Sequence, residues 1–158
     1  MCRQLHIRPI LDGDSLKREH DVTARTFRER QNNISREKMK TACENNRKFD
    51  YTEKVFFGRA IRDYDDLIDE AKQQRNCVAS YANWIASGQT LIFVVRETAY
   101  PDRSLATVEI DPKTFEVKQK YLACNRPIRN KSLTDFIERF RKEVAKRAKE
   151  KTEQNCCA

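Results

Sequence analysis

The sequence predicts an α+β fold in which helices pack on an antiparallel sheet of three to four strands. Three observations support this prediction. Gly and Pro number only three and four in 158 residues, which favours long helices over a sandwich of short strands. Strand-like segments follow one another at 91–97, 104–111 and 115–122, and a helical apolar stripe begins after residue 132. With 39% hydrophobic and 35% charged residues, the chain can form one modest core.

The first 48 residues are expected to form a basic N-terminal helical arm. No Pro or Gly interrupts the segment from Leu16 to Arg47, and Asp14 or Ser15 can cap the start of a helix. Large apolar residues are few in this segment, so its stripe is thin for holding a long helix on a core.

A strand and two short helices are expected next. Aromatic and β-branched residues predict a strand at 49–57 that stops at Gly58. Acidic residues from Asp63 onward favour the start of a helix through about residue 73, because they complement the helix dipole. A second helix is predicted to start at Asn76 or Cys77 and to end at Ser87-Gly88.

The following three strands are expected to form an antiparallel meander. Segment 91–97 is apolar, and segments 104–111 and 115–122 alternate in polarity, as half-buried strands do. Turn sequences at 100–103 and 111–113 separate them, and such tight connections make antiparallel pairing the natural arrangement.

The last helix is predicted to begin at a Ser132 cap, with Asp135 at the matching position three residues on. Its apolar face should cover the sheet, and the residues of that face are Leu133, Phe136, Ile137, Phe140 and Val144. The domain organisation is therefore a basic arm at 1–48, an α+β core at 49–145, and an exposed basic helix end with a disordered tail at 146–158.

Positive charge is concentrated at the two ends of the chain. The formal net charge is +8; residues 1–48 hold 12 basic and 7 acidic residues, and residues 131–158 hold 8 and 5. Such ends can bind phosphates or an acidic partner, although a solvated helix surface is an equally good explanation.

No apolar run approaches the roughly 20 residues of a membrane span, and no signal peptide is recognised, so a cytoplasmic protein without membrane contact is expected. The six cysteines are scattered without a C-x-x-C pair, which predicts neither a metal nor a cofactor.

Several segments together resemble the PcfJ-like proteins. The similar segments run from Arg75 to Tyr81 and from Ala86 to Phe93, followed by the Pro101-Asp102 turn, and an Asn-Arg-Pro step follows at 125–127. Upstream, residues 16–21 are similar to the family's Leu-x-x-x-His-Asp, so the similarity covers roughly 16–145. The resemblance implies a setting on conjugative plasmids or in phages, with no established reaction. Two departures stand out, because the family usually has His where Asn76 stands and often Gly-Lys near Leu122-Ala123.

Cys77 is the candidate catalytic residue. A thiol in the first turn of a helix faces the positive end of the dipole, which favours the thiolate, and Ser80 and Tyr81 follow on nearly the same face. The alternative is a small buried packing residue. The packing role is favoured because a nucleophile needs a base within reach, and the two histidines, His6 and His20, lie far away in the sequence.

Two further sets complete the candidates. Four polar residues at strand positions or strand ends can converge beside Cys77, namely Arg96, Glu109, Asn125 and Arg126, although cross-strand pairing explains some of them equally well. Together with Asn76, Ser80 and Tyr81 they form the candidate site around Cys77. Four basic residues of the last helix can follow a phosphate backbone, although local ion pairs compensate part of their charge: Arg139, Lys142, Lys146 and Lys149. The leading hypothesis is an accessory protein of a mobile element that binds a protein or a nucleic acid through its basic ends. The alternative is a Cys77-centred enzyme of unknown substrate.

Overall fold

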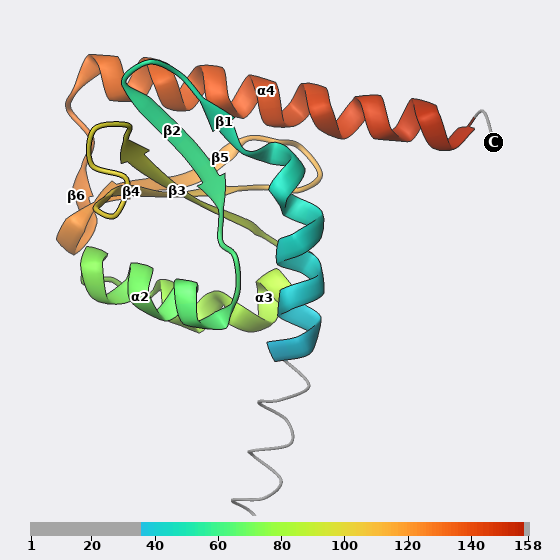
Figure 1. Cartoon of the computed structure of the whole chain (residues 1–158), viewed down its shortest axis with the longest axis horizontal. Helices are drawn as coiled ribbons and strands as arrows, with labels where there is room; N and C mark the ends of the chain where they lie inside the picture. The colour runs from blue at the N-terminus through green and yellow to red at the C-terminus, as the bar shows by residue number, and fades with distance from the viewer. Residues whose placement is uncertain (1–35, 157–158) are drawn as a thin grey trace, which may run out of the picture. The chain divides into compact units, whose positions relative to one another are not determined.

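The computed structural model describes residues 36–156, with side chains through residue 150 (Figure 1). Residues 36–46 are helical, and a 3-10 turn, η1 (Arg47–Phe49), leads into the sheet. The strands are β1 (Tyr51–Thr52), β2 (Phe56–Ala60), β3 (Leu91–Glu97), β4 (Ser104–Ile110), β5 (Val117–Leu122) and β6 (Arg126–Pro127). The helices and remaining turns are α2 (Tyr64–Gln74), η2 (Val78–Tyr81), α3 (Ala82–Ala86), η3 (Ala123–Asn125) and α4 (Lys131–Cys156). The α+β prediction is confirmed.

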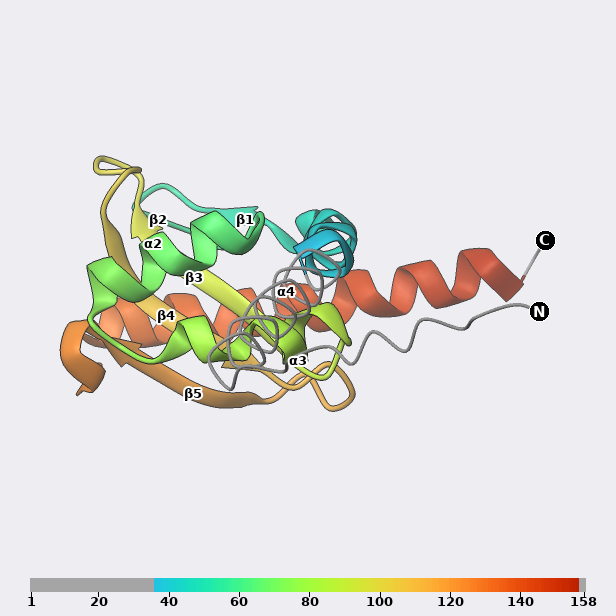
Figure 2. The same cartoon turned by 90° about the horizontal axis from the view of Figure 1, so that it is seen from below.

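The sheet is antiparallel throughout and its six strands pair in chain order, from β1 to β6. It therefore has more strands than the three to four predicted. Helix α4 covers one face, and α2, η2 and α3 lie against the other (Figures 1 and 2). Because both faces are covered, every β4 residue from Ala106 to Ile110 is buried. Alternate β4 side chains therefore point to the two covered faces of the sheet, and none of these five faces solvent.

The core beneath α4 is rich in aromatic rings. Phe93 of β3 lies edge-to-face with Phe140 of α4 at 5.0 Å between ring centroids, and Phe140 stacks parallel to Phe136 at 6.1 Å. All five residues of the predicted α4 stripe are buried, as the helical period requires: Leu133, Phe136, Ile137, Phe140 and Val144.

The core on the opposite face draws on the helical residues 36–46. Met39 and Cys43 are buried there, together with Leu67 of α2 and with Ile92 and Val94 of β3. Contacts divide the chain into two compact units, and the second unit begins at Ser35. Met39 and Cys43, which were assigned to the arm from the sequence, therefore lie within the second unit. Residues 1–35 of the predicted arm lie outside the described residues.

The predicted strand at 49–57 is wrong in its extent. Instead, β1 and β2 form a hairpin, with Tyr51 opposite Gly58. Gly58 does not end a strand but lies inside β2, where a Cβ atom would come within 3.0 Å of the Phe140 ring. Glycine is favoured here because the Phe140 ring approaches the β2 backbone so closely that a Cβ atom would force the ring to shift.

Three features of the helices also differ from the prediction. The helix expected from residue 76 is a 3-10 turn, η2, followed by the five-residue α3. Helix α4 begins one residue before Ser132, and Asn130 caps it by accepting a 3.1 Å hydrogen bond from the Leu133 N–H. At its other end α4 continues to Cys156, through residues where a disordered tail was expected.

Candidate functional site

A small pocket lies between η2 and the outer half of the sheet. It has a volume of about 50 Å³, room for a water molecule or a small polar group. Its lining comes from η2, β3, β4, β5 and η3, and consists of Asn76, Cys77, Val78, Tyr81, Ile92, Thr107, Glu109, Gln119, Tyr121 and Asn125. The structure thus brings together Cys77 and four of its proposed companions, Asn76, Tyr81, Glu109 and Asn125.

The Cys77 thiol is exposed, so the favoured expectation of a buried packing cysteine is wrong. The residue precedes η2 rather than lying in the first turn of a long helix, and the N–H of Val78 donates instead to Asn76 Oδ1 at 3.1 Å. A four-residue 3-10 turn aligns few peptide dipoles, so the helix-dipole argument for an activated thiolate fails as well. Among the described residues no histidine lies near the thiol, because His6 and His20 fall outside them.

Glu109 supplies the carboxylate of the pocket. It is 8% exposed, and its Oε1 atom accepts a 2.8 Å hydrogen bond from the Oγ1 of Thr90, which is buried. Glu109 projects from the face of β4 that packs toward α2 and η2, as Thr107 does two residues earlier. The sheet therefore holds a fixed acceptor beside an exposed thiol.

Asn125 forms the pocket wall on the η3 side, where the backbone is strained. Cys124 and Asn125 have φ values of 59° and 55°, two consecutive residues in the left-handed region. Asn tolerates this conformation better than Cys does, and such strain costs of order 1–3 kcal/mol at a non-glycine residue. The turn holds Asn125 against the pocket.

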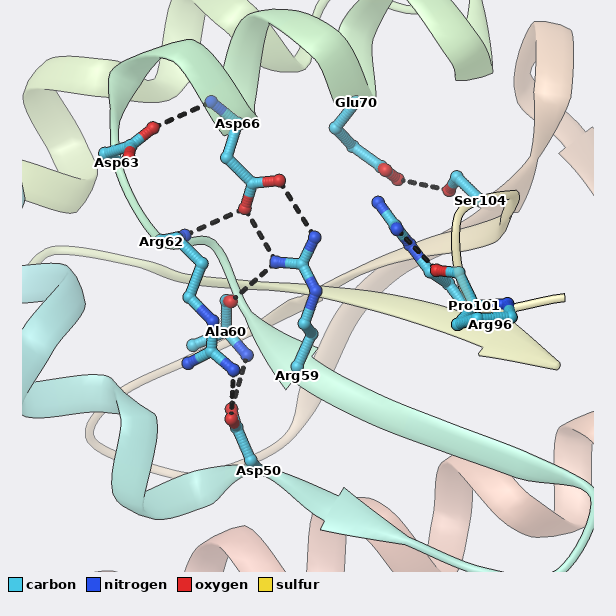
Figure 3. A network of polar contacts seen from close by, with 10 residues as sticks. All are labelled: Asp50, Arg59, Ala60, Arg62, Asp63, Asp66, Glu70, Arg96, Pro101 and Ser104. Atoms are coloured by element: carbon cyan, nitrogen blue, oxygen red, sulfur yellow. Dashed lines mark hydrogen bonds and ion pairs between the residues drawn. The ribbon is translucent and has the colours of Figure 1, made fainter. Parts of the chain in front are cut away.

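A polar layer beneath α2 supports the pocket (Figure 3). Glu70 of α2 is 1% exposed, and its Oε1 accepts hydrogen bonds from Ser104 Oγ at 2.8 Å and from Thr107 Oγ1 at 2.6 Å. Thr107 also lies 3.5 Å from the Asn76 side-chain nitrogen at the pocket. Burial raises the pKa of Glu70, although the hydrogen bonds from Thr107 and Ser104 and the charge of Arg96 oppose the rise.

The same layer contains an arginine pair on neighbouring strands. Arg59 binds both oxygens of Asp66, at 2.6 and 2.8 Å. Burial opposes the ionisation of Asp66, but these bonds and the Arg62 N–H outweigh it and keep the pKa of Asp66 below its usual range. Arg96 has no such carboxylate partner between residues 36 and 150. Its Nη1 donates to the Pro101 carbonyl at 2.6 Å, and burial lowers its pKa. Arg96 therefore belongs to this layer and not to the pocket.

Two other proposed site residues also lie away from the pocket lining. Ser80 Oγ donates to the Cys77 carbonyl at 2.8 Å, a bond within the η2 turn. Arg126 donates through Nε to the Ala123 carbonyl at 3.0 Å and lines separate hollows at the end of the sheet.

The four basic residues proposed on α4 do not form a uniform stripe. Arg139 makes two 2.8 Å hydrogen bonds to the carboxylate of Glu53, in the β1–β2 connection, and these bonds lower the pKa of Glu53. Lys142 lies 3.9 Å from Glu138, and Lys146 and Lys149 are exposed. Arg139 therefore ties α4 to the hairpin, whereas the three lysines are exposed side chains of α4.

Sequence reasoning missed Glu70, Thr107, Gln119 and Tyr121. Glu70 had a detectable signal, since Leu67, Glu70 and Gln74 follow the inward helical spacing and all three are buried. A carboxylate on the inward face of a helix marks a buried polar contact.

The described part of the chain offers neither a metal-binding cluster nor a membrane-spanning helix. Between residues 36 and 150, no group of three or more His, Cys, Asp or Glu residues could hold a metal ion. In the same part of the chain, no helix is both long and apolar enough to cross a membrane.

Comparison with known proteins agrees with the resemblance in the sequence. A family model described as PcfJ-like protein matches residues 1–137, which include every residue of the pocket and the first part of α4. No curated protein and no solved structure matches the chain. Because the match covers most of the sequence, the chain belongs to the PcfJ-like protein family.

Proposed function

We propose that the chain is an accessory protein of a mobile genetic element, a conjugative plasmid or a phage, and that it acts in the cytoplasm by binding nucleic acid through its basic terminal segments. Membership of the PcfJ-like family supports the setting. Gene neighbourhood tests it: transfer genes beside this one support conjugation, head or tail genes support a phage, and a constant chromosomal neighbourhood contradicts both.

The end of α4 is the observation that carries the binding proposal. Val144 is the last buried residue of α4 among the described side chains, yet the helix continues to Cys156 and runs out past the sheet (Figure 1). Lys146 and Lys149 are exposed beyond Val144, and Lys142, which lies 3.9 Å from Glu138, is exposed one turn earlier. The spacings of four and three place the three lysines along one side of the helix. A helix edge that carries lysines beyond the core is suited to contact successive phosphates.

Binding measured as a function of salt tests this proposal. Fluorescence anisotropy of labelled DNA and RNA at several salt concentrations should show an affinity that falls steeply as salt rises, because bound counterions are released. The triple variant K142E/K146E/K149E should bind at least about tenfold more weakly, with a slope in log Kd against log salt reduced by about 3. The triple variant K72E/K113E/K118E makes the same charge change elsewhere and should bind nearly as the wild type does.

Two results would overturn nucleic-acid binding. Absence of binding to DNA and RNA at low salt would leave an acidic protein as the partner of the lysines. Equal losses in the two triple variants would show that only net charge matters and that α4 is not the binding surface.

A Cys77-centred enzyme is the second candidate, favoured by the exposed thiol in the same pocket as Glu109. The carboxylate can accept the thiol proton as a general base, which is how a weak nucleophile is activated. A panel of electrophilic probes tests this role by mass spectrometry of labelled Cys77. Glu109→Gln should slow the labelling severalfold while the exposed Glu138→Gln leaves it unchanged; equal rates in all three proteins would exclude Glu109 as the base.

A further inference from the structure

The end of the sheet carries a groove that lies apart from the Cys77 pocket. It consists of three adjoining hollows of about 420, 250 and 470 Å³. The first and second share Tyr100 and Arg103, and the second and third share Leu122 and Arg126. We call this continuous surface, between the β3–β4 turn and the start of α4, the sheet-end groove.

The lining of the sheet-end groove includes two acidic residues, Glu97 and Asp102, and three arginines that form no ion pair with any described residue. Arg103, Arg126 and Arg129 are exposed, and none forms an ion pair with another residue between 36 and 150. By contrast, Arg139 and Arg141 of α4 are paired with carboxylates. Arg126 uses its Nε on the Ala123 carbonyl, which fixes its guanidinium and leaves the terminal N–H groups for a ligand.

An aromatic ring lies over the same groove. Tyr100 is 62% exposed and lines the first two hollows, while Leu105 and Leu122 give the second hollow an apolar surface. Two hydrogen bonds brace the turn that holds Tyr100. The Arg103 N–H donates to the Tyr100 carbonyl at 3.1 Å, and Arg96 Nη1 donates to the Pro101 carbonyl at 2.6 Å (Figure 3). Arg96 is thus a positioning residue for the turn that carries this ring.

We infer that the sheet-end groove binds single-stranded nucleic acid, with a base stacked on Tyr100 and phosphates bound by Arg103, Arg126 and Arg129. Arginines interleaved with an exposed aromatic ring provide the two contacts that an unpaired strand offers, charge and an open base face. A duplex satisfies only the first contact, because its bases are already stacked. This inference rests on the proposed nucleic-acid binding and adds the form of the nucleic acid and a second surface.

Anisotropy with a labelled 12-nucleotide oligo(dT) and a 12-base-pair duplex tests the inference in the full chain. Tyr100→Ala should weaken oligo(dT) binding by about 5- to 150-fold, the factor that corresponds to about 1–3 kcal/mol of base stacking, and leave duplex binding within twofold. Tyr100→Phe retains the ring and should bind as the wild type does. The double variant R103E/R126E should lose oligo(dT) binding by at least tenfold, and thermal melting checks that each variant is folded.

The outcomes separate this inference from the proposed function. If Tyr100→Ala and R103E/R126E bind oligo(dT) normally while K142E/K146E/K149E does not, the groove inference fails and the α4 proposal stands. If an acidic peptide such as oligo-glutamate binds through the same arginines more tightly than oligo(dT), the groove recognises a protein. A loss of oligo(dT) binding confined to the groove variants would support the groove as the binding surface and exclude α4 from that role.

Discussion

Thr107 Oγ1 donates a 2.6 Å hydrogen bond to Glu70 Oε1, joining the middle of β4 to α2 across 37 residues of sequence. The second carboxylate oxygen of Glu70 is buried without a hydrogen-bond partner among the described residues. A buried carboxylate with one satisfied oxygen is expensive to ionise, and this explains why burial raises the pKa of Glu70. The contact also places Thr107 at the Cys77 pocket, so the stability of the polar layer and the shape of the pocket are linked.

The first prediction concerns the pH dependence of stability at Glu70. Because its folded pKa lies above the ordinary value of 4.5, the folded protein keeps a proton that the unfolded chain releases, so its contribution to stability falls as pH rises from about 4.5 through the folded pKa. Glu70→Gln cannot titrate and still accepts from Thr107. The free energy of unfolding of the variant minus that of the wild type should therefore increase between pH 4 and pH 7, by about 1.4 kcal/mol for each pKa unit of elevation.

Urea unfolding at several pH values measures this difference, and Glu138→Gln is the matched control. Hydrogen bonds from Arg141 lower the pKa of Glu138, so its ionised form stabilises the fold and the corresponding difference should decrease with pH. A Glu70→Gln difference that does not change with pH would show that Glu70 has the same pKa in the folded and unfolded chains.

The second prediction concerns the contact between Gly58 and the ring of Phe140. Gly58→Ala should lower the free energy of unfolding by about 1–3 kcal/mol, because the new Cβ would lie 3.0 Å from a ring that packing holds in place. Gly58→Ala combined with Phe140→Leu should cost less than the sum of the two single changes, since Leu removes the clash. Additive losses in the double-mutant cycle would contradict the steric explanation.

The third prediction concerns the reactivity of two cysteines. In a protein whose Cys2, Cys124, Cys156 and Cys157 are changed to Ser, a thiol reagent should label Cys77 quickly in the native state, because that thiol is exposed. Cys43 is 1% exposed, and burial raises its pKa to about 11, so it should react only on unfolding. Mass spectrometry of the labelled peptides distinguishes the two, and rapid native labelling of Cys43 would mean that residues 36–46 detach from the core.

The fourth prediction concerns the helical residues 36–46. Met39 is fully buried, so Met39→Ala should lower the free energy of unfolding by about 2–5 kcal/mol. Its exposed neighbours provide the control, because Lys38→Ala and Lys40→Ala should change stability by no more than about 0.5 kcal/mol. Equal, small effects at all three positions would show that the core begins at residue 49, as the sequence alone suggested.

The sequence predicted those elements of the fold whose pattern depends only on residues near one another in the chain. Strand β3 was predicted with its observed bounds, and the stripe of α4 was predicted residue by residue, because periodicity depends only on near neighbours. The β1–β2 hairpin was missed because Gly58 reads locally as a strand stop, and only the approach of Phe140 gives it a place inside a strand. Residues 36–48 were assigned to the basic N-terminal arm, because the apolar residues of this segment make too thin a stripe to reveal a core contact.

The candidate site divides in the same way. The sequence by itself determined that Asn76, Cys77 and Tyr81 lie close together, since they are near neighbours in the chain, and it identified the family. Only the tertiary structure decided that Glu109 and Asn125 join them, that Arg96 and Arg126 do not, and that the Cys77 thiol is exposed. The reason is that strand pairing and helix docking set which side chains meet across the sheet, and these depend on the burial of apolar faces far apart in the sequence.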